Sequence, residues 1–269
     1  MKKIKLLSLA IVGILTIGLV GCGSGTKDDK TIKIGVSAVP HKAIVEQVKS
    51  DLEAEGYTLE IQEFSDYVTP NTALQDGDLD ANFFQHIAYL NKTNSSKGYD
   101  LTYTAEIHIE PMGVYSKTIK NTDDIKDGAT IAIPNDPSNE ARALRLLAKA
   151  GLITINDSEI ATPKDIIENK KNLKFTELEA AQLPRILEEM DLAVINGNYA
   201  LQANLDLNKD AIIVEDKNEE SIKDMRNILA VKKGTEDSAK IKALTKSLTS
   251  EKVRTYIEET YKGTVIPVF

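Results

Sequence analysis

The sequence has very little cysteine and no tryptophan. Cys22 is the only cysteine in 269 residues, so the chain cannot form an internal disulfide. With no Trp and only 5 Phe, we expect a core built mainly from Ile, Leu, Val and Ala. Basic residues are also in deficit, because 33 Lys and Arg stand against 41 Asp and Glu. Such an acidic chain lacks the basic patches that would bind nucleic acid or anionic lipid through bulk charge.

Sequence motifs of several common enzyme classes are missing. The chain contains no Gly-x-Ser-x-Gly, no P-loop and no Cys-x-x-Cys. His41, His86 and His108 do not have the i, i+4 spacing of a zinc site on a helix. We therefore predict a protein that is not an enzyme and that has no cofactor and no resident metal.

The first 21 residues have the pattern of a secretory signal. Lys2, Lys3 and Lys5 precede an apolar run over residues 6–20, and small residues lie just before Cys22. The run is about 15 residues long, shorter than the ~20 that span a bilayer. We interpret residues 1–21 as a signal peptide, and we expect the mature protein to be exported.

Cys22 stands where bacterial lipoproteins carry the lipobox, so we expect it to be lipidated and to become the mature N-terminus. Several acyl chains hold a protein firmly at a membrane. Residues 22–30 are small, polar or charged, which predicts a flexible tether. The protein is therefore expected at the extracytoplasmic face of the cell membrane, with its folded part starting near Thr31.

After the tether, predicted strands and helices alternate, which favours an α/β fold with parallel sheets covered by helices. The predicted elements are a strand at 32–36, a helix at 42–55, a strand at 59–64, a short helix at 70–75 and a strand at 79–82.

Two further apolar segments, 113–116 and 228–234, flank a second β/α unit. We interpret them as the places where the chain crosses between two lobes. This predicts lobe 1 from residues 31–112 and 227–269, with helices over 238–261, and lobe 2 from residues 113–226. A cleft between two lobes is a common site for a small ligand.

The second lobe is predicted to open with a strand at 129–133 that leads into a helix. Asp136 suits the N-cap of that helix and Pro137 its first position. The start of the helix then lies beyond the carboxyl end of a strand, where open α/β sheets bind ligands.

Asn139 and Arg142 are three residues apart and project from one face of this helix near its start. A guanidinium can bind a carboxylate through two parallel hydrogen bonds. The pair is a candidate receptor for a ligand carboxylate. The alternative is a solvated Arg142 paired with a helix acid such as Glu140.

Five blocks in a fixed order resemble the NlpA family of lipoproteins, which are substrate-binding components of methionine ABC importers. Together with the lipobox they extend to about Gly234. The blocks are DYVTPNTAL (66–74), GDLDAN with FQH (77–82 and 84–86), PNDPSN with Arg142 (134–139), ELEAAQLPR (177–185), and AVIN with Tyr199-Ala200 (193–196).

The resemblance implies a two-lobed periplasmic-binding-protein fold of type II, in which each lobe is a sheet flanked by helices and the ligand cleft lies between the lobes. It implies that the lobes close on methionine, expected as the L-enantiomer, and deliver it to the permease and ATPase subunits of an importer.

The resemblance also implies site residues. Arg142 is expected to hold the α-carboxylate of the ligand, and Asn139 and Asn196 to contact its backbone polar groups. A charged backbone that loses its water needs full pairing, because an unpaired buried charge is costly.

Tyr67, Phe84 and His86 are expected to surround the ligand side chain, and Tyr115 to lie near the lobe crossing. His41, which matches part of the family pattern, is also expected at the ligand site. Aromatic rings suit methionine, because a thioether interacts favourably with them by about 0.3 to 1.5 kcal/mol per contact.

Three alternatives remain open from the residues. A longer cleft would accept a methionine-containing dipeptide through the same Arg142 and aromatic groups. His41, His86 and His108 with carboxylates would suit a metal receptor. A chain without a small-molecule ligand would be a surface adhesin-type lipoprotein.

Overall fold

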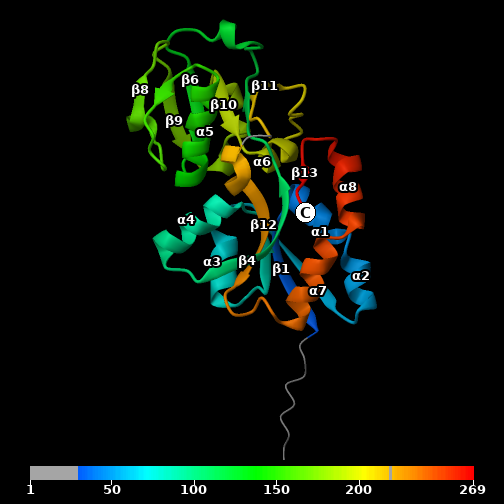
Figure 1. The fold of residues 1–269 in the computed structure, drawn as a ribbon. Helices are drawn as coiled ribbons and strands as arrows, with labels where there is room; N and C mark the ends of the chain where they lie inside the picture. The colour runs from blue at the N-terminus through cyan, green and yellow to red at the C-terminus, as the bar shows by residue number, and fades with distance from the viewer. Residues whose placement is uncertain (1–29, 218–219) are drawn as a thin grey trace, which may run out of the picture.

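A computed structural model describes residues 30–217 and 220–269, which form two α/β lobes stacked one above the other (Figure 1). The predicted signal peptide, Cys22 and residues 23–29 of the predicted tether lie outside these residues. Within the two described ranges, no helix is both long and apolar enough to cross a lipid bilayer.

The first lobe contains a mixed sheet with the strand order β13-β4-β12-β3-β1-β2. β1 pairs in parallel with β2 and β3, whereas β12 runs antiparallel to β3 and β4. The strands are β1 (Thr31–Ser37), β2 (Thr58–Phe64), β3 (Ala81–Phe83), β4 (Leu101–Ile109), β12 (Arg226–Lys232) and β13 (Ile266–Pro267).

Helices cover both faces of this sheet (Figure 1). Alternate residues of a strand point to opposite faces, and β12 shows this directly. Its Leu229 and Val231 join the core under α1, α2, α7 and α8, while Ile228 and Ala230 join the core under α3 and α4. The helices are α1 (Ala43–Glu46), α2 (Lys49–Ala54), α3 (Thr69–Asp76), α4 (Ile87–Lys97), α7 (Ala239–Leu248) and α8 (Glu251–Tyr261).

The second lobe contains a sheet with the strand order β11-β5-β10-β6-β9, again mixed. β6 is parallel to β9 and β10, and β5 is antiparallel to β10 and β11. The elements are β5 (Gly113–Tyr115), β6 (Thr130–Pro134), α5 (Pro137–Lys149), β9 (Lys174–Leu178), β10 (Leu192–Ile195), α6 (Gly197–Gln202) and β11 (Ala211–Val214), with the separate pair β7 (Thr154–Ile155) and β8 (Ile166–Glu168).

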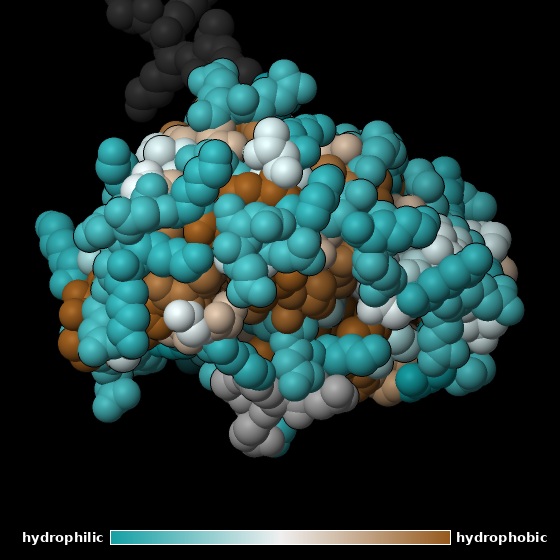
Figure 2. Space-filling model, turned by 90° about the horizontal axis from the view of Figure 1, so that it is seen from above, coloured by the Kyte–Doolittle hydropathy of each residue, from teal (hydrophilic) through white to brown (hydrophobic). Residues whose placement is uncertain are grey.

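Short helical turns connect these elements. They are η1 (Ala38–Lys42), η2 (Thr122–Asp124), η3 (Pro163–Asp165), η4 (Ala180–Gln182), η5 (Arg185–Glu188) and η6 (Glu220–Met225). Seen from above, polar residues cover most of the surface and hydrophobic ones appear between them in separate areas (Figure 2). This agrees with cores that are enclosed within each lobe.

The chain passes between the two sheets twice. It leaves the first after β4 ends at Ile109 and enters the second at Gly113, and it returns between the end of β11 at Val214 and the start of β12 at Arg226. We call residues 110–112 the first crossing segment, and residues 215–217 together with 220–225 the second. They lie where the two lobes meet.

The sequence predicted most of these elements at nearly the observed positions, but not all. The helix expected over 42–55 is divided into α1 and α2. At the break, the side chain of Gln47 donates to the carbonyl of Ala43, and the N–H of Val48 donates to the carbonyl of Val45, three residues earlier instead of four. β3 begins two residues later than expected, and α4, β4, β7, β8, β9, α6, β11 and β13 were not predicted. Both sheets are mixed rather than parallel, because β12 returns antiparallel to β3 in the first lobe and β5 runs antiparallel to β10 in the second.

We predict that Ile34→Ala lowers the free energy of unfolding by about 2–5 kcal/mol, because Ile34 lies in β1 with no solvent exposure and its truncation leaves a cavity. Urea unfolding would measure this as a lower midpoint at an unchanged slope. Ile167→Ala is the control, since Ile167 is 66% exposed. Equal midpoints for the two variants would contradict the assignment of the core.

Candidate functional site

A pocket lies between the lobes, with an empty volume of about 340 Å³ that includes space open to solvent. Loops at the carboxyl ends of β2, β3, β6 and β10 supply much of its lining, as expected for an α/β fold. The lining residues are Tyr67, Phe84, Gln85, His86, Tyr89, Glu110, Asn139, Arg142, Asn196, Gly197, Asn198 and Asn227.

The start of α5 is built as the sequence predicted. The Asp136 carboxylate caps the helix by accepting a hydrogen bond from the backbone N–H of Asn139 at 3.0 Å. The Asn139 side chain donates to the same carboxylate, and its Oδ1 accepts from Asn196 Nδ2 at 2.7 Å and pairs with His86 Nε2 at 3.1 Å. Asn139 therefore connects the loops that follow β3, β6 and β10.

Arg142 is buried, and its two parallel hydrogen bonds go to Glu215 rather than remaining free for a ligand. Nε donates to Glu215 Oε1 at 2.8 Å and Nη2 donates to Oε2, while Nη2 also donates to the carbonyl of Glu110 at 2.8 Å. This corrects the expectation of a bidentate clasp on a ligand. The described residues supply no hydrogen-bond partner for Nη1, which leaves that nitrogen for a ligand at the pocket.

The pairing of Arg142 with Glu215 also shifts the pKa of both groups. Burial opposes ionisation of Glu215, but the adjacent Arg142 outweighs burial and lowers the pKa of the Glu215 carboxyl. Burial acts against the charge of Arg142 too, and Glu215 more than compensates and raises its pKa. Both groups are therefore charged at neutral pH.

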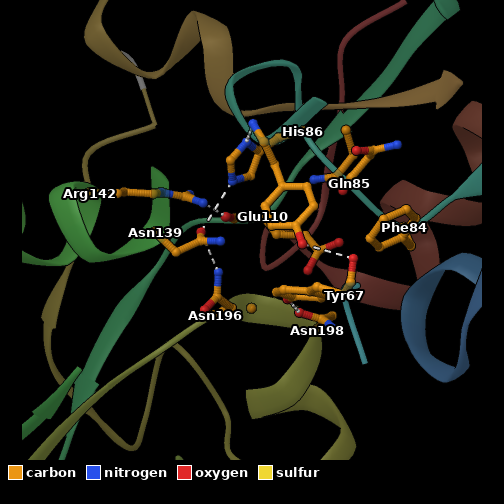
Figure 3. Close-up of a pocket in the computed structure, with 12 residues that line it drawn as sticks. Tyr67, Phe84, Gln85, His86, Glu110, Asn139, Arg142, Asn196 and Asn198 are labelled. Atoms are coloured by element: carbon orange, nitrogen blue, oxygen red, sulfur yellow. Dashed lines mark hydrogen bonds between the residues drawn. The ribbon is translucent and has the colours of Figure 1, made fainter. Parts of the chain in front are cut away.

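The two ends of the pocket differ in chemistry. Arg142, Asn139 and Asn196 lie on one side in Figure 3, and Tyr67 and Phe84 lie on the other. The Tyr67 ring centre is 5.9 Å from that of Phe84, 5.8 Å from that of Tyr89 and 5.0 Å from that of Tyr199. The pocket thus has a polar end and an aromatic end.

Hydrogen bonds join the two lobes around the pocket. Besides the bond between His86 and Asn139, Tyr67 Oη donates to Asn198 Oδ1 at 2.5 Å and Tyr199 Oη donates to the carbonyl of Ser65 at 3.2 Å. The structure is therefore a closed arrangement of the lobes.

Burial lowers the pKa of His86 to about 4, and the nearby Arg142 adds to this, so the ring is neutral near pH 7.

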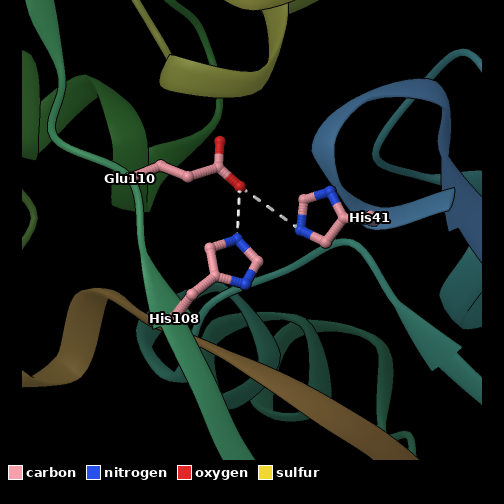
Figure 4. A group of neighbouring side chains, drawn as sticks. All are labelled: His41, His108 and Glu110. Atoms are coloured by element: carbon pink, nitrogen blue, oxygen red, sulfur yellow. Dashed lines mark hydrogen bonds and ion pairs between the residues drawn. The ribbon is translucent and has the colours of Figure 1, made fainter. Parts of the chain in front are cut away.

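Glu110 lies on the first crossing segment and contacts two histidines (Figure 4). Its Oε1 is 2.7 Å from His108 Nε2 and 3.4 Å from His41 Nε2, and all three side chains are buried. Burial raises the pKa of the Glu110 carboxyl, although His41 and Arg142 act in the opposite direction. Burial lowers the pKa of His41 to about 4 and that of His108 to about 3.

One nitrogen or oxygen from each of His41, His108 and Glu110 lies within 4.8 Å of the others, a spacing that could hold a metal ion. The hydrogen bonds favour another interpretation. A metal on His108 Nε2 would move the ring proton to Nδ1, which is buried and has no acceptor among the described residues. His86 does not join the three, because its ring nitrogens pair with Asn139 and the backbone N–H of Tyr89.

Six of the residues expected at the site line the pocket: Tyr67, Phe84, His86, Asn139, Arg142 and Asn196. His41 lies behind the lining, where its Nε2 is 3.0 Å from Asn227 Oδ1. Tyr115 is not among the lining residues. It packs in the core of the second lobe beside Ala193 and Tyr199.

Sequence reasoning missed Gln85, Tyr89, Glu110, Gly197, Asn198 and Asn227. Two of these residues could have been recognised in the sequence as candidates for the site. Glu110 is a charged residue directly after the apolar segment at 107–109, and Asn227 is a polar residue directly before the apolar segment at 228–231. Gln85 binds Asn71 and Asn82 through its side-chain amide, so it holds its own loop in place.

The sequence profile of the family described as NlpA lipoprotein matches residues 32–269. The methionine-binding lipoprotein MetQ of Bacillus subtilis is 41% identical over 100% of this chain and 99% of its own length. The D-methionine-binding lipoprotein MetQ of Salmonella typhi is 40% identical over 96% and 97%. A nutrient-binding protein from Burkholderia cenocepacia, solved bound to methionine, superimposes with a TM-score of 0.83 at 44% identity and covers 88% of this chain and 100% of its own.

We predict that Glu215→Ala lowers the free energy of unfolding at pH 7 by about 3–5 kcal/mol, because it leaves the buried Arg142 charge unpaired. Folding lowers the pKa of the Glu215 carboxyl below its ordinary value of 4.5. The ionised carboxylate therefore stabilises the folded protein fully at pH values above 4.5, and this stabilisation is lost as the pH falls through the lower pKa of the folded protein. Urea unfolding from pH 7 to pH 3 would measure both effects.

Glu168→Ala is the matched control, since Glu168 makes an exposed ion pair with Lys170 at 3.7 Å. A loss of stability in Glu215→Ala as small as that in Glu168→Ala would contradict the role assigned to this pair.

Proposed function

Because this chain belongs to the NlpA lipoprotein family, we propose that it binds methionine in the pocket between its lobes and delivers it to an ABC importer. The observation that carries the proposal is the division of the pocket into a polar end and an aromatic end. A zwitterionic amino acid with an apolar side chain has the same division. The ligand is bound and released without chemical change.

The α-carboxylate is assigned to Arg142. Its Nη1 has no partner among the described residues, and the guanidinium is fixed in place by Glu215 and the Glu110 carbonyl. A donor that is already oriented loses little further freedom when the ligand arrives. Asn139 supports this contact indirectly, since its amide is already bonded to Asp136, Asn196 and His86.

The α-ammonium is assigned to Glu110 and Asn196. Asn196 Oδ1 is buried and has no hydrogen-bond partner in the described part of the chain. A buried acceptor without a partner is costly, and an ammonium group would satisfy it. Glu110 supplies the negative charge, and it lines the same pocket.

The thioether side chain is assigned to the aromatic end. Tyr67, Phe84 and Tyr89 have ring centres 5.8–6.0 Å apart, and sulfur near aromatic rings is favourable by about 0.3 to 1.5 kcal/mol per contact. His86 lies between the two ends and is neutral near pH 7. It does not add a charge that the side chain would have to desolvate.

We propose L-methionine as the ligand, and we expect the site to distinguish it from D-methionine. Contacts to the carboxylate, the ammonium and the side chain come from three directions, so the mirror image cannot make all three in the same pose. Both kinds of relative occur at about the same identity, since the Bacillus subtilis protein is named as methionine-binding and the Salmonella typhi protein as D-methionine-binding. Competition of D-methionine against bound L-methionine would decide the preference.

A methionine-containing dipeptide is a second candidate ligand. A second cavity adjoins the pocket and shares Tyr67 and Tyr89 with it, with Asp136, Glu179 and Tyr199 also in its lining. A residue attached to methionine would have room there once the two tyrosines moved. Methionine alone is favoured because it needs no such movement, and Tyr67 is held in place by its hydrogen bond to Asn198.

In this proposal the protein acts at the outer face of the cell membrane. Lipidated Cys22 anchors it, and residues 22–30 form the tether between the anchor and the folded part. Lobe 1 consists of residues 31–112 and 227–269, and lobe 2 of residues 113–226. The closed lobes present methionine to the permease, and the ATPase subunits drive uptake. The relatives from Bacillus subtilis and Salmonella typhi are named as lipoproteins, which supports the anchor.

We predict that Arg142→Ala weakens methionine binding at least tenfold, about 1.4 kcal/mol, because the carboxylate loses its cationic partner. Isothermal titration calorimetry at pH 7.5 would measure the dissociation constant. Arg145→Ala is the control on the same helix, because Arg145 is exposed and bonds the carbonyls of Ser158 and Glu159 instead. Near-native affinity in a folded Arg142→Ala variant would remove Arg142 from the site.

A further inference from the structure

The Glu110 carboxylate is held between the two lobes by its two oxygens. Oε1 faces His108 and His41 in the first lobe, and the other oxygen points away from both rings (Figure 4). A Cβ placed on Gly197, at the start of α6 in the second lobe, would lie 3.1 Å from Oε2. The absence of a side chain at Gly197 therefore lets the second lobe pack directly against Glu110.

The partners of His41 define its tautomer. Nδ1 is 2.6 Å from the Ser37 hydroxyl, and Nε2 is 3.0 Å from Asn227 Oδ1 and 3.4 Å from Glu110 Oε1. An Nε2 without a proton would point its lone pair at two oxygen acceptors, which would repel it. The proton therefore lies on Nε2, and the Ser37 hydroxyl donates to Nδ1.

His108 has the same tautomer for the same reason. Its Nε2 is 2.7 Å from the Glu110 carboxylate and must donate to it, while Nδ1 is buried without a partner among the described residues. Phe83 packs edge-on against both rings, with centre distances of 4.6 Å to His41 and 5.3 Å to His108. The two rings are thus held in place: His108 donates its N–H to Glu110 Oε1, and His41, which donates to Asn227, lies 3.4 Å from the same oxygen.

We propose that His108 and His41 are positioning residues for ligand binding: the Nε2–H of His108 holds the Glu110 carboxylate ionised and aimed at the ammonium group of the ligand, and His41, whose Nε2–H donates to Asn227, packs beside the same carboxylate oxygen, which makes affinity depend on pH through Glu110. This inference rests on the proposed function, and neither histidine touches the ligand. It assigns a ligand-binding role to two side chains that do not line the pocket.

The direction of the pH dependence follows from the groups that face Glu110. These are His41 and His108 from the first lobe, Arg142 with its partner Glu215, the backbone N–H of Asn198, which donates to the carboxylate, and the hydroxyls of Tyr67 and Tyr261. Burial raises the pKa of the Glu110 carboxyl, so acid adds a proton to the group that must be charged to hold an ammonium. Affinity is therefore constant at higher pH and falls as Glu110 is protonated, by up to about tenfold per pH unit for one proton.

The histidines themselves do not cause this loss. With pKa values of about 4 and about 3, His41 and His108 remain neutral until the solution is more acidic than pH 5. Removing one N–H donor destabilises the ionised carboxylate and raises the pKa of Glu110. The loss of affinity then begins at a higher pH than in the native protein.

The test is calorimetric titration of the mature chain with L-methionine from pH 5 to pH 8. His108→Leu removes the donor at similar volume, and we expect at least tenfold weaker binding at pH 7.5 and an acid loss that begins at higher pH. His108→Gln supplies an amide N–H in place of Nε2–H and is expected to recover most of the affinity. Glu110→Gln is expected to bind weakly at every pH, without the acid loss.

Thr104→Val is the control on the same strand, because Thr104 bonds Thr245 inside the first lobe, away from the pocket. It should keep the native pH profile. A native profile in His108→Leu, with native binding in the parent protein, would overturn this inference alone. A parent protein that does not bind methionine at pH 7.5 would instead refute the proposed function.

A second measurement needs no variant. In ¹⁵N-histidine NMR spectra of the native protein, we expect His41 and His108 to remain neutral Nε2–H tautomers from pH 8 to pH 5 and to shift when L-methionine is added. A ring that becomes cationic near pH 6.5, or one that does not respond to the ligand, would overturn the inference. Binding of Zn²⁺ to these rings in competition with methionine would also overturn the inference, because a metal ion binds a ring nitrogen only when that nitrogen carries no proton.

Discussion

The buried guanidinium of Arg142 joins the two segments through which the lobes are connected. It donates to the carbonyl of Glu110 on the first crossing segment and to the carboxylate of Glu215 on the second, and Glu215 in turn accepts from the backbone N–H of Met112 at 3.1 Å. These charge-assisted bonds are stronger than neutral ones. They fix the relative position of the crossing segments, and therefore the position from which the lobes close.

The same arrangement explains how a charged ligand can be enclosed. A zwitterion that enters the cleft loses its water, and each of its charges then needs a partner. The site provides a fixed cation in Arg142, whose charge Glu215 partly balances, and a fixed carboxylate in Glu110. Because these groups belong to the second lobe and the crossing segments, while Tyr67, Phe84 and His86 belong to the first lobe, the charged backbone and the side chain of the ligand are enclosed together only when the lobes are closed.

Local patterns in the sequence predicted the parts of the structure that depend on local causes. The strand at 129–133, the N-cap Asp136 and the helix carrying Asn139 and Arg142 were recognisable from their residues, and the family resemblance supplied Tyr67, Phe84, His86 and Asn196. The partner of Arg142 was not predictable, because Glu215 is 73 positions away and reaches it only through the fold. Tyr115 lies just after the first crossing segment, as expected, but it packs in the core of the second lobe, since a polar aromatic residue at such a position fits a pocket or a core equally well by pattern.

The central claim is that this pocket holds methionine. The most direct measurement is mass spectrometry of the small molecules released when the purified mature protein is denatured, followed by calorimetric titration of the stripped protein with whatever is released. The account predicts that methionine is recovered and that one methionine rebinds per chain. A released methionyl dipeptide would reassign the substrate, and a protein that carries no amino acid and does not bind methionine would contradict the account.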